Sequence, residues 1–401
     1  MTALPPVVPV LLALVASSLV LWQDRDLRGR VGMAALIAVI PLAAVVSGGV
    51  AFSPLWPPLV AALVVAMLAR ESDDPLQSEC ALKLLWVLGS ALALSWAAVA
   101  LLGAGTGTLR LEEQWTVLAV GTENGVEPGF VWTAALPLSL LAGVVMLGGA
   151  PFHFWPADLV QGTRPWSAPL ALAALQVCGA LWIGSRLEGI ETFLPAARVV
   201  NTLLYSAAVV ALSVSAVTLV LQRRPERRVG SLASLNGALV LATLAVSHGR
   251  PVAGGIRLWP APLWGVHLAL AVTGAALLAR FVPVSERGPA PAPVLFRRHP
   301  VWGVAVLYAV CSLAGVPGTP CAALWLNTAR ALFGAHRTGL LLLLGFAWIM
   351  AFATAARQAR EAFGTVEPAV SSPQPVPWEA RWAMAVAAFG LVLMLASMAR
   401  S

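Results

Sequence analysis

Long apolar runs separated by short polar connections dominate the chain. About twelve of these runs are near the 17–25 residues with which a helix crosses a bilayer. The third run is short, and the tenth is too long for one straight helix and is interrupted at Gly315 and Pro317. The pattern predicts an all-α polytopic membrane protein with runs at 4–22, 31–52, 55–69, 82–103, 130–153, 166–185, 199–221, 230–247, 259–280, 300–333, 338–356 and 378–398.

Composition supports this class. Of the 401 residues, 59% are hydrophobic and 11% are charged, whereas a soluble domain carries about 25% charged residues. The first run has no basic segment before it and no small-residue cleavage site after it, so we expect a retained spanning helix and not a signal peptide. Four cysteines lie in apolar surroundings without metal-site spacing, so we expect buried thiols and no metal: Cys80, Cys178, Cys311 and Cys321.

The basic residues indicate the orientation of the runs. Nearly all are arginines, with Lys83 the one lysine, and no nucleic-acid-binding signature accompanies them. Placing the N-terminus outside puts most of these charges in inward connections and the acidic connection 104–129 outside, which fits the positive-inside rule. Both termini are therefore predicted to be extracytoplasmic. The densest basic cluster is interpreted as a membrane anchor, with anionic lipid or a neighbouring subunit as alternative partners: Arg223, Arg224, Arg227 and Arg228.

One apolar run is interrupted beside ionisable residues. A helix breaks near Gly149 and Pro151, a Trp- and Pro-rich turn carrying His153 and Asp158 follows, and a second helix leaves from Trp166. Broken backbone at membrane depth is tolerated only where protein or a water-filled cavity surrounds it. This interruption therefore indicates a functional site.

A second break, at Gly315 and Pro317, occupies the corresponding place in a later group of runs. Runs two to six and runs seven to eleven form two five-helix units, each with its fourth member broken. Matching interruptions favour inverted repeats, and coincidence is the alternative because Pro and Gly are common in membrane helices. The predicted organisation is an N-terminal transmembrane helix (1–30), a first repeat (31–198), an inverted second repeat (199–365) and a C-terminal transmembrane helix (366–401).

Four motifs occur in an order known from one family. Residues 151–162 read PFHFWPADLVQG, similar to PFHxWxPDxYxG. The other three are ECALK with GAGTGTL (79–83 and 103–109), QRRPERRVGSLASLNG (222–237) and SLAGVPGT (312–319), similar to EAALKY…GATGTL, LRQTNLKRLLAYSSIAHAG and SLAGIPPT. The chain thus resembles the antiporter-like subunits of respiratory complex I, and most of all the subunit N type of NADH–quinone oxidoreductase.

The resemblance implies a fold of fourteen spans with two inverted five-helix units, of which this chain would lack two spans at its N-terminus. It implies a membrane-arm subunit of a complex I-type NADH:quinone oxidoreductase, in a family that couples quinone reduction to proton translocation. NADH, FMN, iron–sulfur clusters and quinone would be bound by partner subunits, and this chain would hold no redox site. Its partners would be other membrane-arm subunits and lipid in a bacterial inner (cytoplasmic) membrane.

The chain departs from the family where proton-moving members carry buried lysines and a glutamate. Motif counting places Met146, Gln176 and Trp325 at the lysine positions and Pro57–Pro58 near the glutamate position. A desolvated lysine can bind and release a proton near ambient pH, whereas Met and Trp cannot titrate and Gln cannot ionise. We therefore expect proton transfer through this chain to be impaired or absent.

Five other ionisable residues are candidates for a proton path. Glu79 and Lys83 lie one helical turn apart and are interpreted as an ordinary i,i+4 salt bridge, with a residual proton-uptake pair as the alternative. His153 and Asp158 are expected to hydrogen-bond the broken backbone. His267 lies mid-run and could titrate, although a hydrogen-bonded structural role is the competing interpretation.

Other functions remain open on sequence alone. The chain could belong to a complex I-like membrane hydrogenase or to a cation/proton antiporter complex. It could be a transporter subunit energised by an ion gradient, with a soluble partner. It could also be a structural membrane scaffold without transport.

Overall fold

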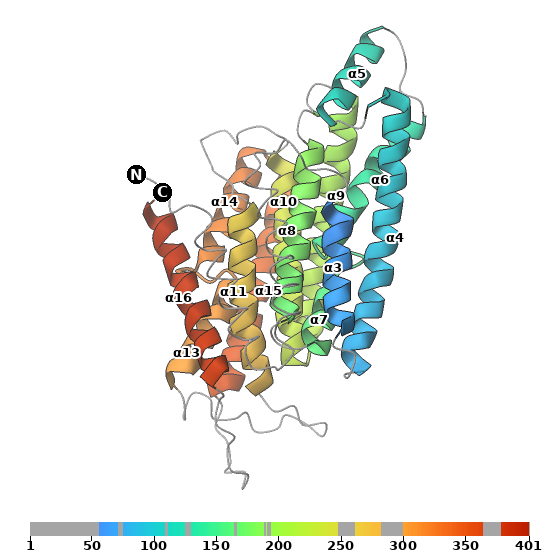
Figure 1. Cartoon of the computed structure of the whole chain (residues 1–401). Helices are drawn as coiled ribbons and strands as arrows, with labels where there is room; N and C mark the ends of the chain where they lie inside the picture. Colours follow the sequence, from blue (N-terminus) through green and yellow to red (C-terminus); the bar gives the residue numbers. More distant parts are fainter. Residues whose placement is uncertain are drawn as a thin grey trace.

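The computed structural model describes residues 56–70, 75–108, 111–124, 130–163, 167–187, 190, 194–247, 261–281, 300–363 and 378–400. These ranges contain helices and no strand, so the all-α prediction is confirmed for them. The long helices run roughly side by side (Figure 1). They are α3 (Trp56–Arg70), α4 (Pro75–Thr106), α5 (Leu111–Glu123), α6 (Phe130–Met146), α7 (Trp155–Gly162), α8 (Ser167–Leu187), α9 (Leu194–Leu221), α10 (Pro225–Ser247), α11 (Ala261–Phe281), α13 (Pro300–Leu313), α14 (Pro320–Gly334), α15 (Thr338–Phe363) and α16 (Trp378–Arg400).

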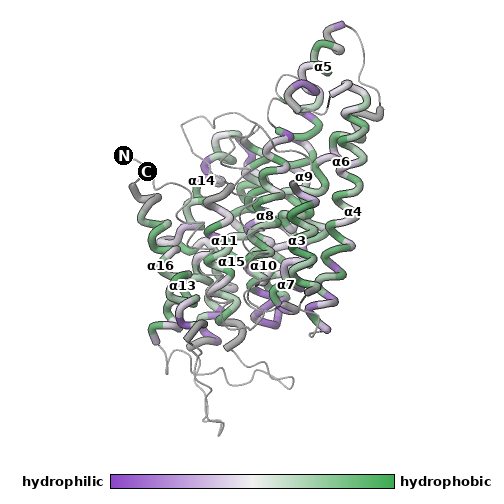
Figure 2. Tube along the Cα trace, in the orientation of Figure 1, coloured by the Kyte–Doolittle hydropathy of each residue, from purple (hydrophilic) through white to green (hydrophobic). Residues whose placement is uncertain are grey.

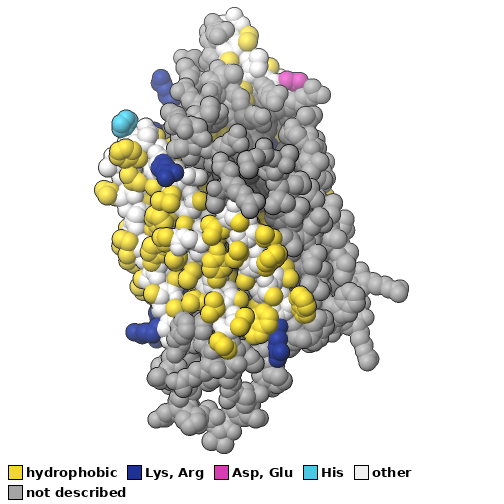
Figure 3. All heavy atoms as spheres, turned by 90° about the vertical axis from the view of Figure 1, so that its left-hand side faces the viewer, with side chains coloured by type: hydrophobic (Ala, Val, Ile, Leu, Met, Phe, Trp, Pro, Cys, Tyr) yellow, Lys and Arg dark blue, Asp and Glu magenta, His cyan; other side chains and the backbone are white. Residues whose placement is uncertain are grey.

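The bundle has the surface of a protein that crosses a bilayer. α4, α8, α9, α10 and α15 are long and apolar enough to span it, and α3, α6, α11, α13 and α16 contain shorter apolar helices. Hydrophilic positions gather toward the ends of the bundle, notably around α7 and the lower end of α10 (Figure 2). One face carries a band of hydrophobic side chains with Lys or Arg above and below it (Figure 3). The protein is therefore a multi-pass membrane protein.

α8 and α10 form the centre of the bundle. In the most apolar window of each, 89% and 83% of the residues are buried, compared with 39% in α4 and α9 and 33% in α15. α11 packs against both central helices. The outer helices expose large apolar side chains such as Trp86 on α4 and Leu342 on α15, and lipid tails can solvate such groups.

The predicted apolar runs correspond closely to the observed helices. A helix or a pair of half-helices lies on every predicted run from residue 55 onward, whereas the runs at 4–22 and 31–52 lie outside the described residues. The connection 104–129 was predicted as a loop, but α5 occupies much of it. Trp115 of α5 is only 2% exposed, so burial of this indole supports a helix that the acidic composition obscured.

Candidate functional site at the two broken helices

The first broken helix, α6, ends in a turn that requires glycine. The N–H of Gly149 donates to the carbonyl of Val144 at 2.9 Å. The N–H of Gly148 donates to the carbonyl of Val145 at 2.9 Å, and Gly148 has φ +72°, a left-handed conformation open to glycine. This pair of bonds is a Schellman ending, which a proline commonly follows. Pro151 takes that place here.

The chain resumes beyond the break as the short helix α7. Gly149 and Pro151 lie between α6 and α7, and Pro156 lies in the first turn of α7, where its missing N–H would have no partner in any case. Asp158 is therefore on a helix and not in the turn predicted from the sequence. His153 does lie in the turn.

Two side chains donate hydrogen bonds to backbone carbonyls at the end of α6 and in the turn that follows it. The indole N–H of Trp155 donates to the carbonyl of Val145 at 2.8 Å. The amide of Gln176, on α8, donates to the carbonyl of Leu147 at 3.3 Å and to that of Ala233 on α10 at 3.1 Å. Gln176 is fully buried. From α8, its uncharged amide connects the turn after α6 to α10.

α10 also contacts the first break directly. The hydroxyl of Ser234 donates to the carbonyl of His153 at 3.0 Å. A Cβ on Gly237 would lie 1.8 Å from the carbonyl oxygen of Leu147, so only glycine allows this approach of helix to turn. The first break is thus held against the middle of α10.

The second broken helix, α13, ends in the same kind of turn. The N–H of Val316 donates to the carbonyl of Cys311 at 3.0 Å, and the N–H of Gly315 donates to that of Ser312 at 3.1 Å. Gly315 has φ +69°, and Pro317 follows. Both breaks therefore use one backbone solution, with Gly at the left-handed position and Pro just beyond.

Neutral donors satisfy the second break as well. The amide of Asn236, on α10, donates to the carbonyl of Leu313 at 2.9 Å. The indole N–H of Trp348, on α15, donates to the carbonyl of Gly315 at 3.0 Å. The thiol of Cys321 donates to the side-chain oxygen of Asn236 at 3.0 Å. α10 therefore connects the two breaks through residues two positions apart, Ser234 and Asn236.

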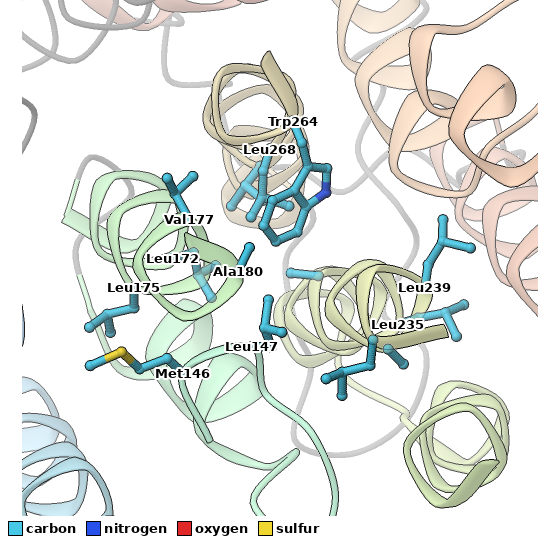
Figure 4. Close-up of a cluster of buried hydrophobic side chains, with 14 of the residues drawn as sticks. Met146, Leu147, Leu172, Leu175, Val177, Ala180, Leu235, Leu239, Trp264 and Leu268 are labelled. Carbon is cyan, nitrogen blue, oxygen red and sulfur yellow. The ribbon is translucent and has the colours of Figure 1, made fainter. Parts of the chain in front are cut away.

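The predicted lysine-equivalent residues all lie inside this region. Met146, Gln176 and Trp325 are each 0% exposed. Figure 4 shows Met146 beside Leu175 of α8, and Gly179 of α8 leaves the room that its Cβ occupies. Trp325 stacks on Trp348, with ring centroids 5.4 Å apart.

The predicted glutamate position is apolar too. Pro57 and Pro58 begin α3, and the buried side of this helix presents residues such as Val60 and Val64. α3 packs against α4 and α8. The four positions that motif counting assigns to ionisable groups are thus filled by side chains that cannot take up a proton.

Glu79 and Lys83 form a salt bridge of 2.6 Å in which both side chains are about half exposed (54% and 51%). This geometry fits an ordinary surface pair on α4. Lys83 also lines a small hollow together with Asp158 and Phe154. The structure therefore brings two of the candidate residues, from α4 and α7, to one place.

Asp158 belongs to an ion-pair connection between α7 and α10. Its carboxylate lies 3.1 Å from Arg227, which also donates to the side-chain oxygen of Gln161 at 2.9 Å. The neighbouring Arg228 is 1% exposed and pairs with Glu361 at the end of α15. Two arginines of the predicted anchor therefore join α10 to neighbouring helices, Arg227 from a half-buried position and Arg228 from a buried one, a role that a sequence pattern of basic residues could not reveal.

His267, on α11, is fully buried beside the second break. Its Nε2 lies 2.8 Å from the hydroxyl of Ser312 in the last turn of α13. This contact fits the structural interpretation of the imidazole. Sequence reasoning missed Ser312, Asn236 and Trp348, although polar residues inside long apolar runs were a signal for the first two.

No group of three His, Cys, Asp or Glu side chains suited to a metal ion occurs in the ranges that the structure describes. Amide, hydroxyl and indole groups hydrogen-bond the broken backbone, and the thiol of Cys321 hydrogen-bonds the side chain of Asn236. Buried polar groups need such partners in a membrane. The arrangement stabilises two interrupted helices without a buried ammonium group.

No protein-family model matches the chain. Over 271 residues it is 31% identical to NADH-quinone oxidoreductase subunit N 1 of Streptomyces griseus, a match that covers 66% of this chain and 54% of that protein. The chain thus spans about half the length of this relative.

Solved structures show the same fold. A chain of respiratory complex I from Thermus thermophilus with bound aureothin superposes with a TM-score of 0.70 at 19% identity, covering 97% of this chain and 82% of that one. A chain of the Mrp complex from Dietzia sp. DQ12-45-1b superposes with a TM-score of 0.65 at 15% identity, covering 92% and 80%. The predicted resemblance is confirmed: the chain is similar in sequence to subunit N of NADH-quinone oxidoreductase, and its fold is that of a chain of respiratory complex I and of a chain of the Mrp complex.

Proposed function

We propose that the chain is a membrane-arm subunit of a complex I-type NADH:quinone oxidoreductase in which its own proton transfer is impaired or absent. The observation that carries the proposal is the uncharged interior of the two breaks, where Met146, Gln176 and Trp325 are fully buried. In this assignment other membrane-arm subunits and lipid surround the chain. Partner subunits bind NADH, FMN, iron–sulfur clusters and quinone.

The inverted-repeat organisation is part of the proposal. Both breaks have the same Schellman geometry, and their second halves lie at opposite ends of the bundle, α7 at the lower end and α14 at the upper end (Figure 1). Opposite placement is what two units of opposite topology require. We place the join between the units at residues 198–199, in the first turns of α9, and assign both termini to the outer side of a bacterial inner membrane.

The loss of proton transfer follows from chemistry at named positions. A path through a low-dielectric core needs groups that exchange protons near ambient pH. Gln176 instead donates to two backbone carbonyls, and Trp325 packs face to face with Trp348. His267 is committed to a contact with Ser312. A subunit built this way serves as a packing partner for its neighbours and does not conduct protons.

The test is proton flux into liposomes that contain the purified chain, driven by a potassium diffusion potential and followed with a pH-sensitive dye. We expect flux no greater than in protein-free liposomes, and no change on His267→Ala. Flux that depends on the protein and collapses on His267→Ala would show that the inactive assignment is wrong.

Restoring lysines supplies a second arm of this test. The triple variant Met146→Lys, Gln176→Lys and Trp325→Lys reintroduces titratable groups at the family positions, and Asn201→Lys on α9, a partly buried position outside both breaks, is the matched control. Flux that appears in the triple variant alone would show that the three positions lie along one path.

A second assembly is supported by the fold match to the Mrp complex. In that case the chain would belong to a cation/proton antiporter complex, and a complex I-like hydrogenase is a related alternative. Purification in mild detergent separates these assignments, because subunits carrying flavin and iron–sulfur clusters, nickel, or neither would accompany the chain. A scaffold without any such partner would be recovered alone.

A further inference from the structure

Two tryptophans fill the space beside the second break. Trp325 of α14 and Trp348 of α15 stack with ring centroids 5.4 Å apart and planes 8° from parallel. The ring centroid of Phe352, one turn further along α15, lies 5.5 Å from that of Trp348. The chain therefore places an aromatic stack where the resembling family has a single charged side chain.

The stack lies directly against the broken backbone. A Cβ on Gly315 would lie 2.3 Å from Trp325 and 3.1 Å from the indole nitrogen of Trp348, so no larger residue fits between the turn and the rings. Trp348 also donates its N–H to the carbonyl of Gly315 at 3.0 Å. The donor that satisfies the buried turn after α13 is thus part of an aromatic stack and needs no water.

We propose that Trp325 and Trp348 form an aromatic plug that excludes water from the second break. A turn in a membrane protein is satisfied either by protein or by a hydrated cavity, and here protein supplies both the hydrogen bond and the filling volume. The plug deepens the proposed function and rests on it in one respect: Trp325 stands at a position assigned to a titratable group, and its stacking on Trp348 adds a barrier of closed packing to the absence of that group. An ion would meet closed packing even if a charge were restored nearby.

Cys321 provides a reporter within the chain itself. It lies one helical turn before Trp325 on α14, is 0% exposed, and donates its thiol to Asn236. A water-filled second break would give a small polar thiol reagent a route to this side chain. Cys178 on α8 is 2% exposed and lies outside the plug, so it reports any general loosening of the bundle.

The experiment measures the labelling rate of each cysteine by a charged methanethiosulfonate reagent in the full-length protein, with mass spectrometry of the peptides. In the wild type we expect Cys321 to label as slowly as Cys178. In Trp325→Ala and in Trp348→Ala we expect the Cys321 rate to rise by about tenfold or more while Cys178 stays protected, because removal of one ring leaves a cavity beside polar groups that water can fill. Trp348→Phe keeps an aromatic ring but loses the N–H that bonds the carbonyl of Gly315, so we expect its Cys321 rate to rise, but less than in Trp348→Ala.

Two results would overturn the plug. One is rapid labelling of Cys321 in the wild type, which would show that water already reaches the break. The other is unchanged protection of Cys321 in both alanine variants when their circular dichroism and thermal melting show that they are folded. If an alanine variant does not fold, the wild-type labelling and Trp348→Phe still decide the question. Proton flux is measured separately, so a conducting chain with a protected Cys321 would refute the proposed function and leave the plug in place.

Discussion

Replacing Asn236 with leucine tests the claim that neutral side chains of α10 hold the breaks together. Leucine has nearly the same shape but removes the amide that donates to the carbonyl of Leu313 at 2.9 Å. That carbonyl lies in the last turn of α13, where no intrahelical donor is available. The thiol of Cys321 loses its acceptor in the same change.

The expected loss is about 1–2 kcal/mol of unfolding free energy. A buried acceptor left without its donor costs about 1–3 kcal/mol. Hydrogen bonds measured within membrane bundles average only about 0.6 kcal/mol, so we expect a loss in the lower part of the first range. The second donation of Asn236, to the carbonyl of Leu232, adds little because that carbonyl lies within α10.

Unfolding in detergent with increasing sodium dodecyl sulfate, followed by circular dichroism, measures this difference. Hydrogen exchange gives a local readout, because the amides of Gly315 and Val316 are bonded within the turn and should exchange faster in Asn236→Leu. The matched control is Asn201→Leu on α9, a partly buried residue that should change stability by less than about 0.5 kcal/mol. Equal stability and equal exchange in Asn236→Leu and the wild type would refute the assignment.

Three further comparisons test the ion pair between α10 and α15, the close approach at Gly237 and the surface pair on α4. Glu361→Gln should lower the unfolding free energy by about 3 kcal/mol, because it leaves the buried guanidinium of Arg228 without its carboxylate. Arg228→Met should lower it less, because this change removes the buried charge. Detergent unfolding that gives the reverse order would contradict the role of this ion pair. Gly237→Ala should lower the unfolding free energy by about 3 kcal/mol, because its Cβ would overlap a backbone carbonyl at the first break. Gly345→Ala, with open space around it, should be neutral or stabilising. Equal melting temperatures for the two variants would count against the close approach at Gly237. Lys83→Gln should change the unfolding free energy by less than about 0.5 kcal/mol because its pair with the preceding turn is exposed, and a larger loss would show that the pair does more than stabilise α4.

The sequence by itself determined the helices and the positions of their interruptions. Consecutive apolar residues of bilayer length can satisfy their backbone only as helices, so each run from residue 55 onward carries a helix. Gly315 and Pro317 end a helix for local reasons, since a left-handed residue and a missing N–H act on the backbone within a few residues. α5 is the exception, because burial of Trp115 outweighs an acidic and otherwise loop-like composition.

Only the tertiary structure decided what holds the breaks. Gln176 reaches the carbonyl of Leu147, 29 residues away, and Asn236 reaches that of Leu313, 77 residues away; no periodicity within one helix encodes such pairs. The same limit applies to Arg227 and Arg228, which look like a surface anchor until α7 and α15 pack against them. Hydrogen bonds and ion pairs act over a few ångströms. Which side chains satisfy a broken helix is therefore set by the packing of the bundle, whereas the existence of the break is set by the chain.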